Sequence, residues 1–254
     1  MLIELKSQLE IIGGDAELIN EIKSHLDKPN PDFAKMKRMG YPTHTISPRI
    51  RMYDIQDKRL FCPRCSLSLV RQLCKKYNEK LVIKDNRTTT KPIDVRLKDL
   101  DPFWYQNEAV DVMVQSQSGI VVAPCGAGKT AIGLMFIAQL KKPTLILVHT
   151  LELFKQWEDM IQKYLVVPGK VGKIGSGRKS LGYITIAMIQ TLVKLPDKDW
   201  EAINEKFEIF LGDEAHHFGA DSYMKIMKRN SAKYSLGLTA TPNRRDKKDF
   251  IVQN

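Results

Sequence analysis

The sequence predicts an α/β fold with a central parallel sheet, preceded by a small α+β domain. From Leu100 onward, short apolar runs alternate with amphipathic segments at helical spacing, which is typical of a parallel sheet with helices on both faces. One apolar run, 120–122, leads through a glycine-bearing turn into Lys129, Thr130 and an apolar helix, the layout of a phosphate-binding loop. We expect three segments: a small basic domain at 1–90, a linker at 91–100 and the α/β domain at 101–254.

Length and composition favour a soluble globular protein of one or two domains. The 254 residues are 43% hydrophobic, enough for a packed core. No apolar run approaches the roughly 18 residues that span a bilayer, and the N-terminus lacks the basic-then-apolar layout of a signal peptide. We therefore expect no membrane partner and a cytoplasmic location, in the host cytoplasm if the protein is viral. Four cysteines in a chain of this length predict no disulfide framework.

The net charge of +11 is unevenly spread along the chain. Residues 33–76 carry eleven Lys and Arg against two acids, a net charge of +9. A basic stretch of this size predicts a polyanion partner, most often a nucleic acid, whereas the alternative is a solvated surface on a basic protein. Charge does not separate DNA from RNA. The candidate nucleic-acid contacts in this stretch are Lys37, Arg38, Arg49 and Arg51.

Short strands and helices are expected in the first hundred residues. Apolar spacing and turn residues define them, and Asp15 is a plausible N-cap for the first helix. The expected elements are a strand within 2–12, a helix at 15–26 that Pro29 and Pro31 close, a basic helix at 33–39, a strand at 49–55, a helix at 66–77 and a strand at 81–83.

Cys62 and Cys65 have the spacing of half a zinc site. Structural zinc usually takes four ligands, most often from two such pairs. Cys74 lies nearby but on the apolar side of an expected helix, and His44 has no spacing that recommends it. We expect no zinc and interpret Cys62–Cys65 as a turn that leads into the helix at 66–77, with zinc kept as the alternative.

The second domain is expected to alternate strands with helices. Polar motifs follow the strands, so they should converge on the carboxyl edge of one parallel sheet. The expected elements are a helix at 101–116, strands at 120–122, 144–149, 183–188, 207–211 and 234–238, and a helix at 152–164 besides the one that follows Lys129; the stretch 171–174 is short and apolar.

The residue types in the phosphate loop explain how it would bind an anion. Gly126 and Gly128, on either side of Ala127, let the backbone curl so that N–H groups point inward, next to the positive end of a helix. Lys129 then reaches the β- and γ-phosphates, and the Thr130 hydroxyl ligates Mg²⁺. The strict motif has Gly where this chain has Ala at position 123. The alternative is a glycine turn beside a surface lysine.

Asp213 and Glu214 directly follow an expected buried strand. At that position the Asp213 carboxylate holds Mg²⁺ beside Thr130, directly or through water. Glu214 is then placed to orient or deprotonate the water that attacks the γ-phosphate. An isolated Asp-Glu pair would instead indicate a surface turn.

Three ordered motifs give the chain a family resemblance. APCGAGKT at 123–130, DEAH at 213–216 and TATP at 239–242 resemble the first RecA-like domain of superfamily 2 helicases and translocases. In that family Ala is common at the position of Ala123. The resemblance implies ATP and Mg²⁺ as cofactors and ATP hydrolysis as the activity.

The resemblance also implies roles for residues outside the phosphate loop. Gln106 looks like the adenine-reading glutamine, beside Phe103 and Trp104, which either cover the adenine ring or belong to the core. Residues that couple ATP state to nucleic-acid grip would be His216, Thr239 and Thr241. Contacts to the strand backbone would come from Thr150, from Gln156 with Trp157, and from Gln190 with Thr191, although Thr and Gln in loops are often only capping residues.

Longer segments resemble one branch of the superfamily. GLTATPNRRD at 237–246 and DEAHHFGADSY at 213–223 look like XPB-like helicases, type I and III restriction translocases and bacteriophage branch-migration helicases. The layout of residues 1–90 resembles the small domain that such phage helicases carry, which contacts duplex or branched DNA. We keep two alternatives: a passive nucleic-acid-binding module with a weak nucleotide site, and an RNA-directed motor.

Motors of this superfamily need a second RecA-like domain. It supplies an arginine finger whose loss costs roughly 10³–10⁵ in rate. The sequence ends at Asn254, shortly after TATP, and Arg244 and Arg245 follow the first domain's own motif. We therefore expect this polypeptide to be the N-terminal half of a longer protein that binds ATP-Mg²⁺ and turns it over slowly or not at all.

Overall fold

The chain is described here from a computed structural model, in which residues 1–214 and 220–240 have defined positions. The chain divides into two compact units, Met1–Arg87 and Thr88–Pro242. His216 and Thr241, which we expected to couple nucleotide state to nucleic-acid grip, lie outside the described residues. The two units are taken in turn.

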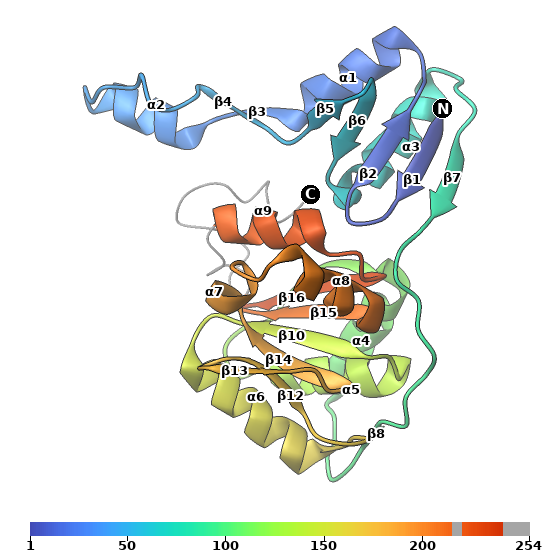
Figure 1. Cartoon of the computed structure of the whole chain (residues 1–254), viewed down its shortest axis with the longest axis vertical. Helices are drawn as coiled ribbons and strands as arrows, with labels where there is room; N and C mark the ends of the chain where they lie inside the picture. Colours follow the sequence, from blue (N-terminus) through green and yellow to red (C-terminus); the bar gives the residue numbers. More distant parts are fainter. Residues whose placement is uncertain (215–219, 241–254) are drawn as a thin grey trace. The chain divides into compact units, whose positions relative to one another are not determined.

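The first unit is a small sheet covered by two helices (Figure 1). Its described strands form a five-stranded sheet in the order β5-β6-β2-β1-β7. Side chains from three of these strands share one apolar core with α1 and α3. The bounds are β1 (Leu2–Leu5), β2 (Leu9–Ile12), α1 (Ala16–Leu26), β3 (Asp27–Pro29), α2 (Pro31–Arg38), β4 (Arg49–Arg51), β5 (Asp54–Gln56), β6 (Arg59–Cys62), a 3₁₀ turn (Arg64–Ser66), α3 (Leu67–Lys76) and β7 (Val82–Asp85).

Three expectations for this unit were wrong in detail. The strand expected within 2–12 is an antiparallel hairpin, in which Leu5 pairs with Leu9. The strand expected at 49–55 is two strands in different sheets, because β4 pairs with β3 and β5 pairs with β6. Pro31 does not close α1; it stands at the start of α2, where its missing N–H costs nothing.

The segment around α2 projects from the first unit as an arm. Antiparallel β3 and β4 form a two-stranded ribbon, and α2 follows β3 at the far end of it (Figure 1). The side chain of Asn30 caps α2 by accepting a hydrogen bond from the Asp32 N–H at 3.1 Å. No residue of α2 is buried, so this helix contributes nothing to the core.

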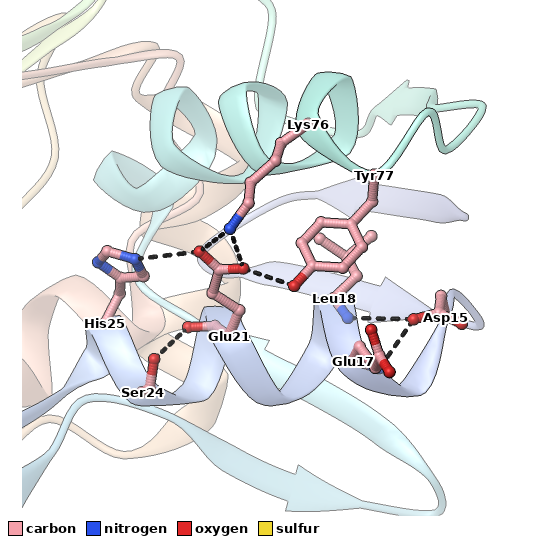
Figure 2. Close-up of polar contacts among 8 residues, drawn as sticks. All are labelled: Asp15, Glu17, Leu18, Glu21, Ser24, His25, Lys76 and Tyr77. Atoms are coloured by element: carbon pink, nitrogen blue, oxygen red, sulfur yellow. Dashed lines mark hydrogen bonds and ion pairs between the residues drawn. The ribbon is translucent and has the colours of Figure 1, made fainter.

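A carboxylate on α1 links this helix to the end of α3 (Figure 2). Glu21 accepts hydrogen bonds from Lys76 Nζ at 2.8 and 2.7 Å and from the Tyr77 hydroxyl at 2.6 Å. His25 Nε2 lies 3.9 Å from the same carboxylate. The Lys76 and then the Tyr77 hydrogen bonds hold the pKa of Glu21 below its ordinary value of 4.5, and the Glu21 carboxylate raises the pKa of Tyr77 to about 12. At its other end, α1 is capped by the expected Asp15.

Cys62 directly precedes a turn that contains Cys65, as expected. Cys62 ends β6, and the 3₁₀ turn Arg64–Ser66 leads directly into α3. Burial raises the pKa of the Cys62 thiol to about 12 and that of Cys65 to about 11. Both thiols are therefore protonated at neutral pH.

The second unit is a parallel α/β sheet, and the expected fold class is confirmed. Its described strands form a seven-stranded sheet in the order β13-β12-β14-β10-β15-β16-β9, in which only β13 runs antiparallel to its neighbour. The bounds are β8 (Arg96–Leu97), α4 (Trp104–Ser116), β9 (Ser118–Val122), α5 (Lys129–Leu140), β10 (Thr144–Val148), α6 (Leu151–Tyr164), β11 (Leu165–Val166), β12 (Gly172–Gly175), β13 (Arg178–Ser180), β14 (Ile184–Met188), α7 (Ile189–Leu192), α8 (Asp197–Lys206), β15 (Ile209–Asp213), α9 (Ala220–Arg229) and β16 (Tyr234–Thr239).

Helices cover both faces of this sheet. Successive side chains of a strand point to opposite faces, so Ile146 and Leu147 of β10 belong to two separate cores. One core packs against α4, α5 and α6, and the other against α7, α8 and α9 (Figure 1). The central strands are therefore buried on both sides, which explains their continuous apolar sequences.

The stretch 91–100, expected to be a linker, is partly packed into the second unit. Ile93 and Val95 are 8% and 0% exposed and belong to the core beside α4, α5 and α6. Farther along, β8 pairs with β11. The alternation of apolar and polar residues at 93–96 marks a half-buried extended segment rather than a solvated connection.

No helix among the described residues is long and apolar enough to cross a membrane.

Replacing Glu21 by Gln is expected to destabilise the first unit in a pH-dependent way. A carboxylate whose pKa is lowered in the folded state stabilises that state above its unfolded pKa, and this contribution disappears as the pH falls through the folded pKa. The difference between wild type and E21Q should therefore be full at pH 6 and should shrink below pH 4.5.

Hydrogen exchange of α1 and α3 peptides, compared between the two proteins at the same pH, measures this difference. Glu17→Gln, an exposed substitution on the same helix, is the control. A difference between wild type and E21Q that does not change with pH would contradict the assignment.

Candidate active site

The phosphate loop connects β9 to α5 and has the backbone that its glycines predict. Gly126 and Gly128 have φ angles of +85° and +74°, a left-handed conformation that other residues adopt only with strain. Gly128 is the N-cap of α5, so the loop ends at the positive end of this helix. A Cβ built on Gly126 would meet nothing within 4 Å, so the loop is open at this point.

Gln106 is attached to the phosphate loop. Its Nε2 donates to the Ala127 carbonyl at 3.0 Å, and its Oε1 accepts from the Phe103 N–H at 3.0 Å. The side chain is 4% exposed, and a Cβ on Gly128 would lie only 2.5 Å from Gln106 Nε2. The first turn of α4 and the loop are thus in direct contact. Phe103 and Trp104, for which a place in the core was one alternative, are instead 63% and 76% exposed.

Lys129 and Glu214, 85 positions apart in the sequence, meet at the carboxyl edge of the sheet. Lys129 Nζ lies 3.5 Å from Glu214 Oε1, with the two side chains 10% and 23% exposed. Lys129 begins α5, and Glu214 directly follows β15 with a φ of +50°. A non-glycine residue in this left-handed region costs about 1–2 kcal/mol, and such strain is common at functional sites.

Asp213 is buried at the end of β15 and is held by two donors. Its Oδ2 accepts from the Trp157 indole N–H at 2.8 Å, and its Oδ1 accepts from the Glu214 backbone N–H at 3.0 Å. Burial, which leaves the residue 3% exposed, raises the pKa of Asp213, while the Trp157 hydrogen bond opposes that shift. A cation at this position would favour the charged carboxylate.

Thr130 contacts the helix that also supplies Trp157. The Thr130 Oγ1 accepts a hydrogen bond from Gln156 Nε2 at 3.3 Å. Gln156 and Trp157 are consecutive on α6, so Thr130 and Asp213 lie against neighbouring residues of one helix.

These side chains suit a magnesium-bound nucleotide. The loop has the open, left-handed backbone that an anion needs, with one ammonium group beside it. Hydroxyl and carboxylate oxygens, which Mg²⁺ prefers, come from Thr130 and Asp213. A second carboxylate, on Glu214, is close to Lys129 and available as a base.

The other residues expected at this edge follow the neighbouring strands. Thr150 caps α6, since its Oγ1 accepts from the Leu153 N–H at 3.2 Å, which is the capping role that we kept as the alternative. Gln190 Nε2 donates to the His149 carbonyl at 2.8 Å and so lies beside the short connection between β10 and α6. Thr191 is on the short helix α7 after β14. Thr239 ends β16, and its carbonyl accepts from the Ala123 N–H at 2.9 Å.

The structure corrects the interpretation of Trp157. We expected it, with Gln156, among the contacts to a nucleic-acid strand, but its side chain is 0% exposed and its N–H contacts Asp213. The sequence contains a signal for burial, because Phe154, Trp157 and Ile161 repeat at helical spacing. Nothing in that pattern points to a particular carboxylate.

The expected nucleic-acid contacts of the basic stretch belong to the first unit. Lys37 and Arg38 lie on α2 and are exposed. Arg51 is exposed on β4, whereas Arg49 is partly neutralised, because its Nε lies 2.9 Å from Asp27 Oδ2. Among the described residues, Lys35, Lys37 and Arg38 of α2 make no ion pair, and neither does Arg51 of β4.

Comparison of the sequence with known proteins finds relatives that match more than half of the chain. DNA 3'-5' translocase XPB2 of Sulfurisphaera tokodaii is 34% identical over 179 residues, which cover 70% of this chain and 39% of the relative. DNA 3'-5' helicase XPB of Kineococcus radiotolerans is 34% identical over 160 residues, covering 58% and 27%. A putative ATP-dependent RNA helicase of Acanthamoeba polyphaga mimivirus is 34% identical over 137 residues, covering 53% and 25%. The chain therefore spans less than half the length of these relatives.

Solved structures share the fold. The UvsW helicase from bacteriophage T4 superposes with a TM-score of 0.70 at 19% identity, covering 100% of this chain and 98% of the solved chain. The SWI2/SNF2 ATPase core of Sulfolobus solfataricus, solved with double-stranded DNA, gives a TM-score of 0.52 at 19% identity and covers 64% of this chain and 36% of the solved chain.

The profile of the family described as "Type III restriction enzyme, res subunit" matches residues 99–244, more than half of the chain. That match includes the phosphate loop, Asp213, Glu214 and Thr239. The chain therefore belongs to this family of superfamily 2 and is related in sequence to the XPB-like helicases.

Proposed function

We propose that this chain is the ATP-binding part of an ATP-dependent DNA helicase or translocase. The observation that carries the proposal is the 3.5 Å contact between Lys129 and Glu214, which brings the phosphate loop to the acidic end of β15. The printed names of two relatives, a DNA 3'-5' translocase and a DNA 3'-5' helicase, support the choice of DNA.

The residues of the site divide the chemistry of ATP hydrolysis among them. Backbone N–H groups of the loop and the N-terminus of α5 bind the phosphates, together with the Lys129 ammonium. Thr130 and Asp213 would hold Mg²⁺, which neutralises charge that develops on the phosphate oxygens. Glu214 accepts the proton of the attacking water. A phosphate bound to Lys129 would compete with the contact between Lys129 and Glu214.

Gln106 connects the adenine side of the site to the phosphate side. Its amide bridges the Phe103 N–H and the Ala127 carbonyl. The rings of Phe103 and Tyr105 are stacked, with centroids 5.6 Å apart, and Tyr105 also contacts Ala127 through its hydroxyl at 3.4 Å. We propose that the first turn of α4 contacts the adenine. Gln106 then couples the position of the adenine to that of the phosphate loop, because its amide bonds to both segments.

The arm of the first unit is the proposed DNA contact. Phosphate groups attract Lys and Arg without regard to sequence, and Lys35, Lys37 and Arg38 stand on a helix with no core contact. Because α2 packs against no core, its basic side chains are accessible to a binding partner. Arg51 extends the same charge along the ribbon.

An RNA-directed motor is the second candidate. It is favoured by the mimivirus relative, whose printed name describes a putative ATP-dependent RNA helicase. The positive charge of the arm does not distinguish between the two candidates, since DNA and RNA both offer phosphate groups.

Lys129→Ala is expected to weaken the binding of ATP-Mg²⁺ by about tenfold or more, equivalent to about 1.4 kcal/mol. The substitution removes the ammonium that faces the phosphates. Isothermal titration calorimetry measures the affinity, and Lys141→Ala, at the exposed opposite end of α5, is the matched control. Equal affinity of wild type and K129A would refute the assignment of the loop.

Replacing Lys35, Lys37 and Arg38 together by Ala is expected to weaken binding to forked and duplex DNA. If each of the three side chains contacts one phosphate, the plot of log binding constant against log salt concentration should become shallower in the variant. Its negative slope should lose about 2.7 in magnitude, because each contact contributes about 0.9. Fluorescence anisotropy on forked DNA, duplex DNA and RNA at several salt concentrations measures both quantities.

The control replaces Lys6, Lys23 and Lys80, which lie in the same unit outside the basic stretch. Unchanged affinity and slope in the α2 variant would show that the arm is a solvated surface. A wild-type preference for RNA would favour the second candidate.

A further inference from the structure

Two consecutive residues of α6 contact the two residues that would hold magnesium. Gln156 Nε2 donates to Thr130 Oγ1 at 3.3 Å, and Trp157 Nε1 donates to Asp213 Oδ2 at 2.8 Å. Thr130 belongs to α5 and Asp213 to β15, two elements that are far apart in the sequence. One turn of α6 therefore links the two halves of the site.

The indole of Trp157 is fixed in place by a glycine on α5. A Cβ built on Gly133 would lie 2.7 Å from Trp157 Cη2 and 2.9 Å from a Leu211 methyl group, so only Gly leaves room for the ring. Gly133 lies about one turn after Lys129 and Thr130 on the same helix. The ring thus packs at one edge against the helix that carries the loop residues and donates at its nitrogen to the carboxylate of β15.

Both oxygens of Asp213 have a donor, and both keep capacity for a further ligand. Oδ2 accepts from Trp157 and Oδ1 from the Glu214 N–H. A carboxylate has about four acceptor positions, so two donors fix its plane and leave the remaining lone pairs in defined directions. Buried polar groups that are held in this way resist rotation.

The hydroxyl of Thr130 is oriented in the same manner. It accepts one hydrogen bond from Gln156, which leaves its second lone pair for a ligand. Gln156 itself is exposed, so its amide contributes this contact without being part of the core.

We propose that Gln156 and Trp157 are positioning residues of the magnesium site: they orient Thr130 and Asp213 from α6 and thereby set the affinity for the cation. The proposal rests on the proposed function, because it assigns a cation to these two residues. It also gives the glycine at position 133 a role, since that glycine determines where the indole lies.

The test measures how much Mg²⁺ strengthens nucleotide binding. Calorimetric titration of the full chain with ATP, in excess Mg²⁺ and in EDTA, gives two dissociation constants, and their ratio reports the cation's contribution. Loss of a hydrogen-bonded partner behind a metal ligand typically costs 10–100-fold in metal affinity. Trp157→Phe should therefore lower the ratio about tenfold and leave binding in EDTA unchanged.

Matched controls separate positioning from packing. Trp200 is also buried, at 2% exposed, and its indole N–H has no acceptor among the described residues, so W200F loses the same ring volume without losing a hydrogen bond. Gln156→Ala leaves the core intact and should lower the ratio about threefold to tenfold, the range for one hydrogen bond. Its control is Gln139→Ala, an exposed glutamine on α5 that also donates at 3.3 Å, to Asp111.

The outcomes are distinct. A lower ratio in W157F and Q156A, with unchanged ratios in W200F and Q139A, supports the proposal. If wild type shows a clear effect of Mg²⁺ and Q156A and W157F retain it in full, the positioning roles are wrong and the proposed function stands. If W157F does not fold, Q156A decides. If wild type binds ATP without any effect of Mg²⁺, the magnesium site and this inference are both wrong.

Discussion

Parallel pairing of β15 with β10 and β16 is the constraint on which the rest of the second unit depends. In this register Asp213 pairs with Leu238, and Thr239 pairs with Val122 of β9, so the carboxyl ends of these strands lie at one edge. Each loop that follows a strand then opens beside its neighbours. The sheet brings together the strands that precede these loops, and so it brings together Lys129, Thr130, Asp213 and Glu214. All five residues of β10 are buried, which makes any shift of register costly.

Burial at the same edge determines the electrostatics of the site. Asp213 is nearly inaccessible to water, which favours its neutral form, and the Trp157 N–H partly offsets that effect. The left-handed Glu214 leaves the buried strand and reaches the ammonium of Lys129. Two carboxylates in adjacent positions thus have different surroundings: one is buried and hydrogen-bonded, and the other is paired with a cation.

The basic arm and the candidate nucleotide site belong to different units of the chain. In the first unit, a compact core and the Glu21 cluster stand beside an arm whose helix α2 has no buried residue. This helix keeps three basic side chains without an ion pair among the described residues. In the second unit, Asp213, whose pKa is raised by burial, and Glu214, with its left-handed backbone, lie next to each other at the sheet edge. This separation is consistent with one unit that grips a polyanion and another that binds the nucleotide.

The sequence by itself determined the phosphate loop, the Asp15 cap and the alternation of the central strands with α4, α5 and α6, because these depend on residue types a few positions apart. It did not indicate the helices α7, α8 and α9. Gly126, Gly128 and Asp15 illustrate this, since turn geometry and capping are local. Only the tertiary structure decided that Trp157 donates to Asp213, 56 residues away, and that Gln156 contacts Thr130. Periodicity shows that an indole is buried, whereas the partner of its N–H depends on which strands are neighbours and on the space left at Gly133.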